Sequence, residues 1–197
     1  MKIFEEAGFL ALVHKYYPTI DCITVYTHAS YFRTGNLIER FQKDVLAEYR
    51  RQGYKNIILV GVSMGGFGAL WLHHFYATDI AGMVVIAPYL GGDFLGDIIA
   101  SNFRKSLAID EGDLEFNALA MQMIDQQMPS LTNKMLLAYG QQDRYANNIV
   151  QFANKLPASS VIASSGGHGW ATWTPIWEII LQQKLLDQFK SAIEYES

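Results

Sequence analysis

The segment that decides the fold reads Asn56-Ile57-Ile58-Leu59-Val60-Gly61-Val62-Ser63-Met64-Gly65-Gly66. A short run of continuous apolar residues, here 56–61, is typical of a strand that is buried on both faces of a sheet. The residues after the glycines, 65–77, are rich in helix-forming apolar side chains and predict a helix. The segment is therefore a buried strand that turns directly into a helix, with Ser63 at the turn.

Gly61, Ser63 and Gly65 form a G-x-S-x-G pattern, and its context makes it informative. A sharp strand-to-helix turn strains the serine backbone, and side chains two residues to either side would clash. Gly66 and Gly68 then let the helix pack closely. The serine is left at a helix N-terminus, where the backbone dipole favours a developing negative charge. The alternative is an ordinary glycine-rich turn without chemistry.

The composition describes one soluble, folded unit. The 197 residues suit a single domain spanning 1–197, and 50% of them are hydrophobic while only 17% are charged, which excludes a disordered chain. A net charge of −4 with scattered Lys and Arg argues against nucleic-acid binding. The apolar run 57–72 is too short and too glycine-rich for membrane insertion, and the first residues lack signal-peptide features. The single cysteine, Cys22, excludes an internal disulfide and fits a cytoplasmic location.

Strand-like and helix-like segments alternate along the chain, which predicts an α/β fold. We expect a mostly parallel sheet of about five strands with helices on both faces. The expected strands are 20–26, 56–61, 82–87, 134–139 and 160–163. The expected helices are 3–16, 36–52, 65–77, 94–107, 114–127, 146–156 and 175–194. Residues 89–130 would hold a small cap or line a pocket, and functional residues should follow the carboxyl ends of the strands.

A serine hydroxyl needs a base to become a nucleophile. His168 lies in the glycine loop that follows strand 160–163, and is the best candidate. His28 follows strand 20–26 but precedes the serine in the chain, whereas His14, His73 and His74 fall on predicted helices. No pair of histidines has metal-ligand spacing together with a suitable carboxylate, so we expect no metal site.

The carboxylate that orients the histidine should lie between serine and histidine in the chain. Asp143 comes four residues after strand 134–139 and directly before a helix, where it can accept a hydrogen bond from the imidazole. Asp93, after strand 82–87, is the reserve candidate, since some folds of this kind carry the acid there.

With Ser63, Asp143 and His168 in this order, the whole chain resembles the α/β-hydrolase superfamily. Gly167-His168-Gly169-Trp170-Ala171-Thr172-Trp173 is similar to the G-H-x-W-x-x-W ending of esterase-like bacterial hydrolases, and residues 81–91 look like the strand and loop after their serine turn. The resemblance implies a three-layer fold and a serine hydrolase that cleaves an ester or thioester through an acyl-serine, without a cofactor. It leaves acyl transfer, and association into a homo-oligomer, open.

The expected pocket for a small ester or acyl substrate is lined by aromatic and apolar side chains near the strand ends. These are Tyr31, Phe32, Tyr89, Leu90 and Trp170, together with residues 91–130. Core or rim packing is the alternative role for each of the aromatic residues.

The chain departs from the family pattern at its N-terminus, where the first strand and the loop after it are missing. That loop supplies half of the oxyanion hole, so the amide of Met64 is the remaining donor. We expect strand 20–26 to close against strand 56–61, or another segment or a second copy to fill the gap. Because the pattern begins in the middle of a motif, we also expect Met1 to be an internal methionine of a longer protein. A catalytically weak or inactive protein used for binding or assembly is the alternative function.

Overall fold

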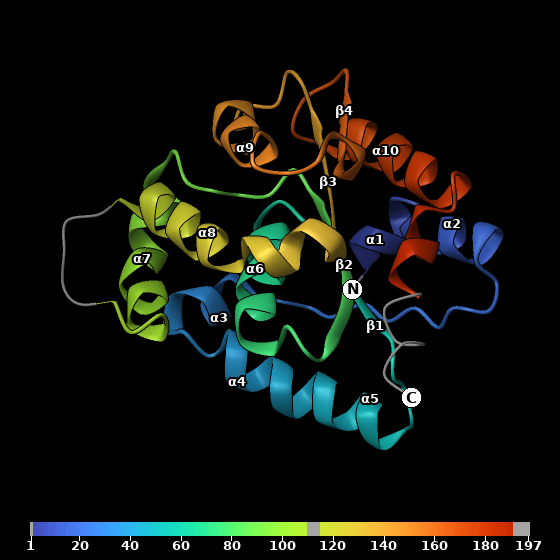
Figure 1. Ribbon diagram of the computed structural model, residues 1–197, viewed down its shortest axis with the longest axis horizontal. Helices are drawn as coiled ribbons and strands as arrows, with labels where there is room; N and C mark the ends of the chain where they lie inside the picture. The colour runs from blue at the N-terminus through green and yellow to red at the C-terminus, as the bar shows by residue number, and fades with distance from the viewer. Residues whose placement is uncertain (1, 110–114, 191–197) are drawn as a thin grey trace.

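The computed structural model describes residues 2–109 and 115–190, and they form a three-layer α/β fold (Figure 1). Its sheet is parallel and has the order β1-β2-β3-β4. The strands are β1 Ile57–Val62, β2 Ile80–Ile86, β3 Met135–Gly140 and β4 Val161–Ser164. Four of the five expected strands are therefore confirmed, with boundaries within two residues of the prediction.

The carboxyl ends of the four strands lie together at one end of the sheet. In the pairing register Val62 lies opposite Ile86, Ile86 opposite Ala138, and Gly140 opposite Ser164. The loops that begin at Ser63 and after β2, β3 and β4 therefore leave the sheet side by side.

Helices cover both faces of the sheet, as its buried central strands β2 and β3 require (Figure 1). One face carries α1 Lys2–Glu6, α2 Phe9–Tyr16 and α10 Trp170–Gln182. The other carries α6 Met64–Tyr76, α8 Phe116–Lys134 and α9 Ala146–Ala153, with the rod formed by α4 Leu37–Phe41, η1 Gln42–Leu46 and α5 Ala47–Arg51 packed on α6. The remaining helices are α3 Ala29–Thr34, which contacts α7 Phe94–Ser106, and the short turns η2 Ala158–Ser160 and η3 Leu185–Phe189. None of the described helices is long and apolar enough to cross a membrane.

Three expected helices differ clearly in the structure. The helix expected over 114–127 begins at Phe116 and continues to Lys134, with Pro129 inside it. The helix expected over 3–16 is split at Gly8, whose φ of 78° lies in the left-handed region. The last helix starts at Trp170 rather than Pro175, because the Gly169 carbonyl already accepts hydrogen bonds from the amides that open the first turn. It ends at Gln182, and the expected residues 191–194 lie outside the described part of the chain.

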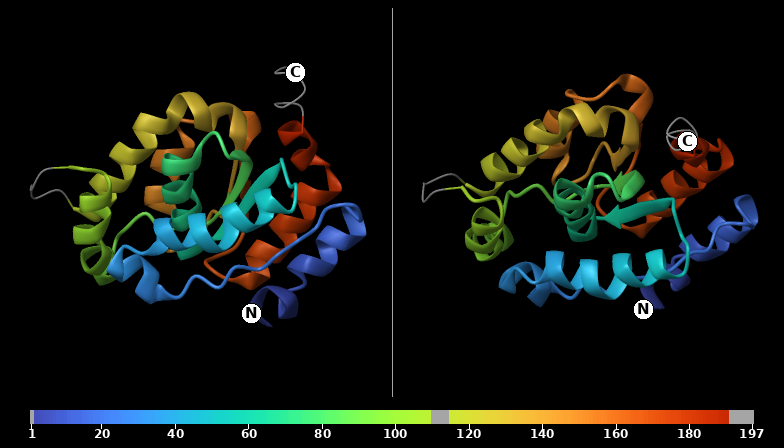
Figure 2. Two further views of the ribbon diagram at one scale, coloured as in Figure 1. Left: turned by 90° about the horizontal axis from the view of Figure 1, so that it is seen from below. Right: turned by 60° about the horizontal axis from the view of Figure 1, so that its bottom comes forward.

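The expected strand 20–26 is wrong. The segment runs as an irregular chain between α2 and α3 (Figure 2), and Ile23, Val25 and Tyr26 are 46%, 45% and 66% exposed. β-branched residues favour a strand only when a neighbouring strand pairs with it. Within the described residues β1 pairs with β2 alone, and Val60 on β1 is 38% exposed. The segment 20–26 therefore does not close against β1, and the outer edge of β1 has no strand partner within the described residues.

The helix behind Ser63 is anchored by a fully buried histidine on α6. His73 Nδ1 lies 2.7 Å from Gln127 Oε1, and His73 Nε2 lies 3.2 Å from Ser130 Oγ. Because the Gln127 amide nitrogen donates to the Met123 carbonyl, its oxygen faces His73 as an acceptor. Nδ1 therefore carries a proton, and in the neutral imidazole the Ser130 hydroxyl donates to Nε2. This network joins α6 to α8.

We predict that acid weakens the fold through His73. Burial lowers the pKa of its imidazole, with the charges of Lys134 and His74 acting in the same direction. Below about pH 6.5, His73 is therefore protonated in the unfolded chain but still neutral in the folded chain. The free energy of unfolding then falls by up to about 1.4 kcal/mol per pH unit. In denaturant titrations between about pH 7 and 5, His73→Asn should flatten this decline. The exposed-site control His14→Asn should not. Equal slopes for wild type and His73→Asn would contradict the assignment.

Candidate active site

Ser63 sits in a strained turn between β1 and α6. Its backbone angles are φ 53° and ψ −119°, a conformation that side chains other than glycine rarely adopt. The surrounding structure holds it there: the Ser63 amide donates to the Ile86 carbonyl at 2.9 Å, and the Ser63 carbonyl accepts from the amides of Tyr89 at 3.0 Å and Phe67 at 3.1 Å. Residues in such backbone regions persist at functional sites when their neighbours over-determine them.

Gly61 and Gly65, the two glycines of the pattern, differ in the space around them. A Cβ on Gly61 would overlap the Gly65 carbonyl and come within 2.9 Å of the Gly66 Cα, so Gly61 is sterically required. A Cβ on Gly65 would meet nothing within 4 Å. The expected clash at Gly65 is therefore wrong, because this residue faces open space in the first turn of α6.

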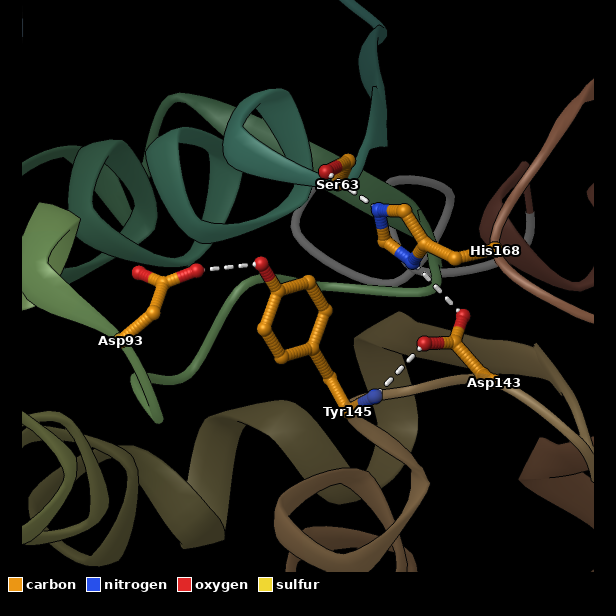
Figure 3. A network of polar contacts seen from close by, with 5 residues as sticks. All are labelled: Ser63, Asp93, Asp143, Tyr145 and His168. Atoms are coloured by element: carbon orange, nitrogen blue, oxygen red, sulfur yellow. Dashed lines mark hydrogen bonds and ion pairs between the residues drawn. The ribbon is translucent and has the colours of Figure 1, made fainter.

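The structure brings Ser63, His168 and Asp143 together (Figure 3). Ser63 Oγ lies 2.9 Å from His168 Nε2, and His168 Nδ1 lies 2.7 Å from Asp143 Oδ2. The Asp143 side chain is fully buried, and its Oδ1 accepts the Tyr145 amide at 2.8 Å. Because a carboxylate only accepts hydrogen bonds, the imidazole proton is on Nδ1 and the Nε2 lone pair faces the serine.

Backbone hydrogen bonds between two loops fix the histidine relative to the acid. The Gln141 amide donates to the Ser164 carbonyl at 2.8 Å, and the Gln142 amide donates to the Gly166 carbonyl at 3.0 Å. The Gln142 side-chain oxygen accepts the Gly166 amide in return. The loop after β3, which carries Asp143, and the loop after β4, which carries His168, therefore behave as one unit.

The other candidates divide into core and surface residues. Phe32, Tyr89 and Leu90 are fully buried, so they pack in the core rather than line a pocket. Tyr31 is half-buried, and Trp170 lines a cavity of about 220 Å³ with Ile3, Glu6 and Ala7.

The Met64 amide is a backbone donor directly next to the serine. Met64 opens α6, and the first amides of a helix have no intrahelical acceptor. In the turn before α3, His28 accepts the Ser30 amide through Nδ1 and the Tyr31 amide through its carbonyl. Those two amides are therefore already used. Within residues 2–109 and 115–190, no cluster of three or more His, Cys, Asp or Glu side chains could hold a metal ion.

Sequence reasoning missed Tyr145. It lies two residues after Asp143, is 8% exposed, and meets the His168 ring edge to face at 5.0 Å and 86°. It also borders a polar cavity of about 370 Å³, whose lining is Gly91, Gly92, Asp93, Arg144, Tyr145, Asn147 and Asn148. An aromatic residue so close to the candidate acid was the only signal in the sequence.

We predict that alanine at the two glycines has opposite effects. Gly61→Ala should lower the free energy of unfolding by about 1–3 kcal/mol, because its methyl group overlaps backbone that cannot move aside. Gly65→Ala, the matched control on the same turn, should leave stability unchanged or raise it by up to about 1 kcal/mol through helix propensity. Urea denaturation of both variants measures this. Equal losses at the two positions would show that the turn is not built as described.

Comparisons with known proteins agree with this architecture. The sequence matches no protein-family model and no curated protein. Among solved structures, it is similar to S-formylglutathione hydrolase FrmB of Staphylococcus aureus, with 15% identity and a TM-score of 0.53 over 79% of this chain and 64% of that one. A ferulic acid esterase gives 15% identity and a TM-score of 0.53, over 77% and 60% of the two chains. FphF, a fluorophosphonate-binding serine hydrolase of Staphylococcus aureus, gives 13% identity and a TM-score of 0.54, over 92% of this chain and 77% of that one.

This chain spans less than two thirds of the length of the first two of these proteins. The similarity nevertheless extends over most of the present chain and includes the parallel sheet with helices on both faces. Together with the strained turn at Ser63, it identifies the architecture: the chain adopts the fold of the α/β-hydrolase superfamily.

Proposed function

We propose that this protein is a serine hydrolase that cleaves a carboxylic ester or thioester through an acyl-serine intermediate. The observation that carries the proposal is the continuous chain of hydrogen bonds from Ser63 through His168 to Asp143, at 2.9 and 2.7 Å. Each distance is within the range that direct proton transfer requires. The structural neighbours support the proposal, since they are named as a hydrolase, an esterase and a serine hydrolase.

In the acylation step, Ser63 Oγ attacks the carbonyl carbon of the substrate, and its proton moves to His168 Nε2. The C=O π electrons move to the carbonyl oxygen, which becomes an oxyanion. Asp143 stabilises the imidazolium, and burial of its side chain strengthens that interaction. When the oxyanion collapses, the bond to the alcohol or thiol breaks and His168 protonates the leaving group.

In the deacylation step, water replaces the leaving group. His168 takes a proton from the water as it attacks the acyl-serine, and then returns that proton to Ser63 Oγ as the acid departs. A nucleophile other than water at this step would make the enzyme an acyltransferase.

The amide of Met64 is the proposed donor to the oxyanion. It is the first amide of α6, so the helix dipole adds to its hydrogen bond. In the turn before α3, the amides of Ser30 and Tyr31 already donate to His28, so we assign the oxyanion to the Met64 amide alone. Loss of one oxyanion donor costs about 10²–10³ in kcat, so we expect slow turnover.

The first functional prediction concerns the nucleophile. A fluorophosphonate probe should label the wild-type chain once, and Ser63→Ala should abolish labelling while leaving the fold intact. Ser165→Ala, which changes an exposed serine in the loop of His168, is the matched control and should label normally. A folded wild-type chain that takes no label would favour the alternative, an inactive protein used for binding or assembly.

The second functional prediction concerns Asp143, the carboxylate of the proposed triad. Asp143→Asn keeps the shape of the side chain but favours the wrong imidazole tautomer, and should lower kcat by about 10²–10⁴. Asp93→Asn should be far milder, because the Asp93 carboxylate is bonded to tyrosine hydroxyls rather than to His168. Steady-state kinetics with an activated ester measure both. A severe Asp93→Asn beside a near-silent Asp143→Asn would reverse the assignment.

A further inference from the structure

A second carboxylate, Asp93, lies on the far side of the Tyr145 ring from Asp143 and His168 (Figure 3). Its Oδ1 accepts hydrogen bonds from the Tyr89 hydroxyl at 2.6 Å and from the Leu95 amide at 3.0 Å, which caps α7. Its Oδ2 accepts the Tyr145 hydroxyl at 2.6 Å. Partial desolvation opposes ionisation of Asp93, but the hydrogen bonds from Tyr145, Tyr89 and the Leu95 amide, with the charge of Arg144, outweigh it and hold the pKa of the carboxyl below its usual value. Asp93 is therefore a fixed, charged acceptor.

Tyr145 connects this acceptor to the triad. Its hydroxyl is held by Asp93, its backbone amide holds Oδ1 of Asp143 at 2.8 Å, and its ring packs against the His168 ring with centroids 5.0 Å apart. A movement of the Tyr145 ring would therefore change its packing against His168, and a movement of its backbone would change the hydrogen bond to Asp143.

The imidazole has few other restraints on its orientation. Asp143 holds Nδ1, Ser63 Oγ lies 2.9 Å from Nε2, and Trp173 meets the ring edge to face at 4.9 Å and 90°. The hydrogen bonds between the loops fix the position of the His168 backbone, but they do not by themselves set the orientation of its ring. The rings of Tyr145 and Trp173 therefore restrict the plane of the imidazole between these two polar contacts.

We propose that Asp93 and Tyr145 form a positioning pair for His168, in which the Asp93 carboxylate fixes the Tyr145 ring and that ring aligns the imidazole. The inference rests on the proposed function, because alignment matters only if His168 is the base. A 1 Å misplacement at a reacting group can cost about 100-fold in rate. Loss of one hydroxyl contact should cost less, and we expect roughly a tenfold fall in kcat.

The kinetic test separates positioning from substrate binding, since Asp93 and Tyr145 also line the 370 Å³ cavity. Tyr145→Phe removes only the hydroxyl, and Asp93→Asn still caps α7, because asparagine is an equally good N-cap. With p-nitrophenyl acetate, each variant should lower kcat about tenfold at unchanged KM. The double variant should be no worse than the poorer single one, because both changes act on the same contact between Asp93 and Tyr145. Asp97→Asn and Tyr26→Phe, at exposed positions, are the controls.

Three kinetic results would overturn the proposal. A raised KM at constant kcat would place the pair in substrate binding alone. Losses that multiply in the double variant would show two independent roles. Wild-type kcat in both single variants would show that the pair does not align the base.

A measurement without turnover distinguishes this proposal from the proposed function. The proton on His168 Nδ1, in its short bond to Asp143, should give a far-downfield proton resonance in the resting protein. Tyr145→Phe and Asp93→Asn should displace or broaden it, whereas Asp97→Asn should not. An inactive wild-type chain with these displacements would refute the hydrolase and retain the positioning pair. An active wild-type chain whose resonance is unchanged in both variants would support the hydrolase and refute the positioning pair.

Discussion

The strained turn at Ser63 is the constraint on which the rest of the site depends. A non-glycine residue at φ 53° costs about 1–3 kcal/mol, and the surrounding structure must offset that cost. Here the Ser63 backbone is bonded on both sides, to the end of β2 through Ile86 and to the loop after it through Tyr89. Gly61 removes the one side chain that would block the turn. The serine is thus displayed by the core of the sheet rather than by a mobile loop.

The parallel sheet explains how residues 105 positions apart, Ser63 and His168, come within hydrogen-bond distance. Parallel strands place their carboxyl ends at one edge, so each successive loop delivers its side chains to the same place. The loops after β3 and β4 are then bonded to each other through Gln142 and Gly166. Asp93, from the loop after β2, reaches the same place through Tyr145. Three strand ends therefore act on one imidazole.

A feature could be predicted from the sequence when the residues that determine it are close together in the chain. Buried strands and the loops after them carry local signals, so four strands and the positions of Ser63, Asp143 and His168 followed from pattern and chain order. Strand 20–26 failed because a strand requires a partner, and pairing is decided elsewhere in the chain. Tyr145 was missed because its bond to Asp93 spans 52 positions. Which of the aromatic residues near the strand ends would be buried also depended on tertiary packing.

The most direct test of the account is the pre-steady-state reaction of the chain with p-nitrophenyl acetate, followed by peptide mapping of the quenched protein. Because this ester is activated by its leaving group, acylation should be faster than deacylation even with one oxyanion donor. We therefore expect a burst of about one nitrophenol per chain, with the acetyl group on the peptide that contains Ser63. Absence of a burst from folded protein, or acetylation at a different residue, would contradict the claim that the strained serine is the nucleophile.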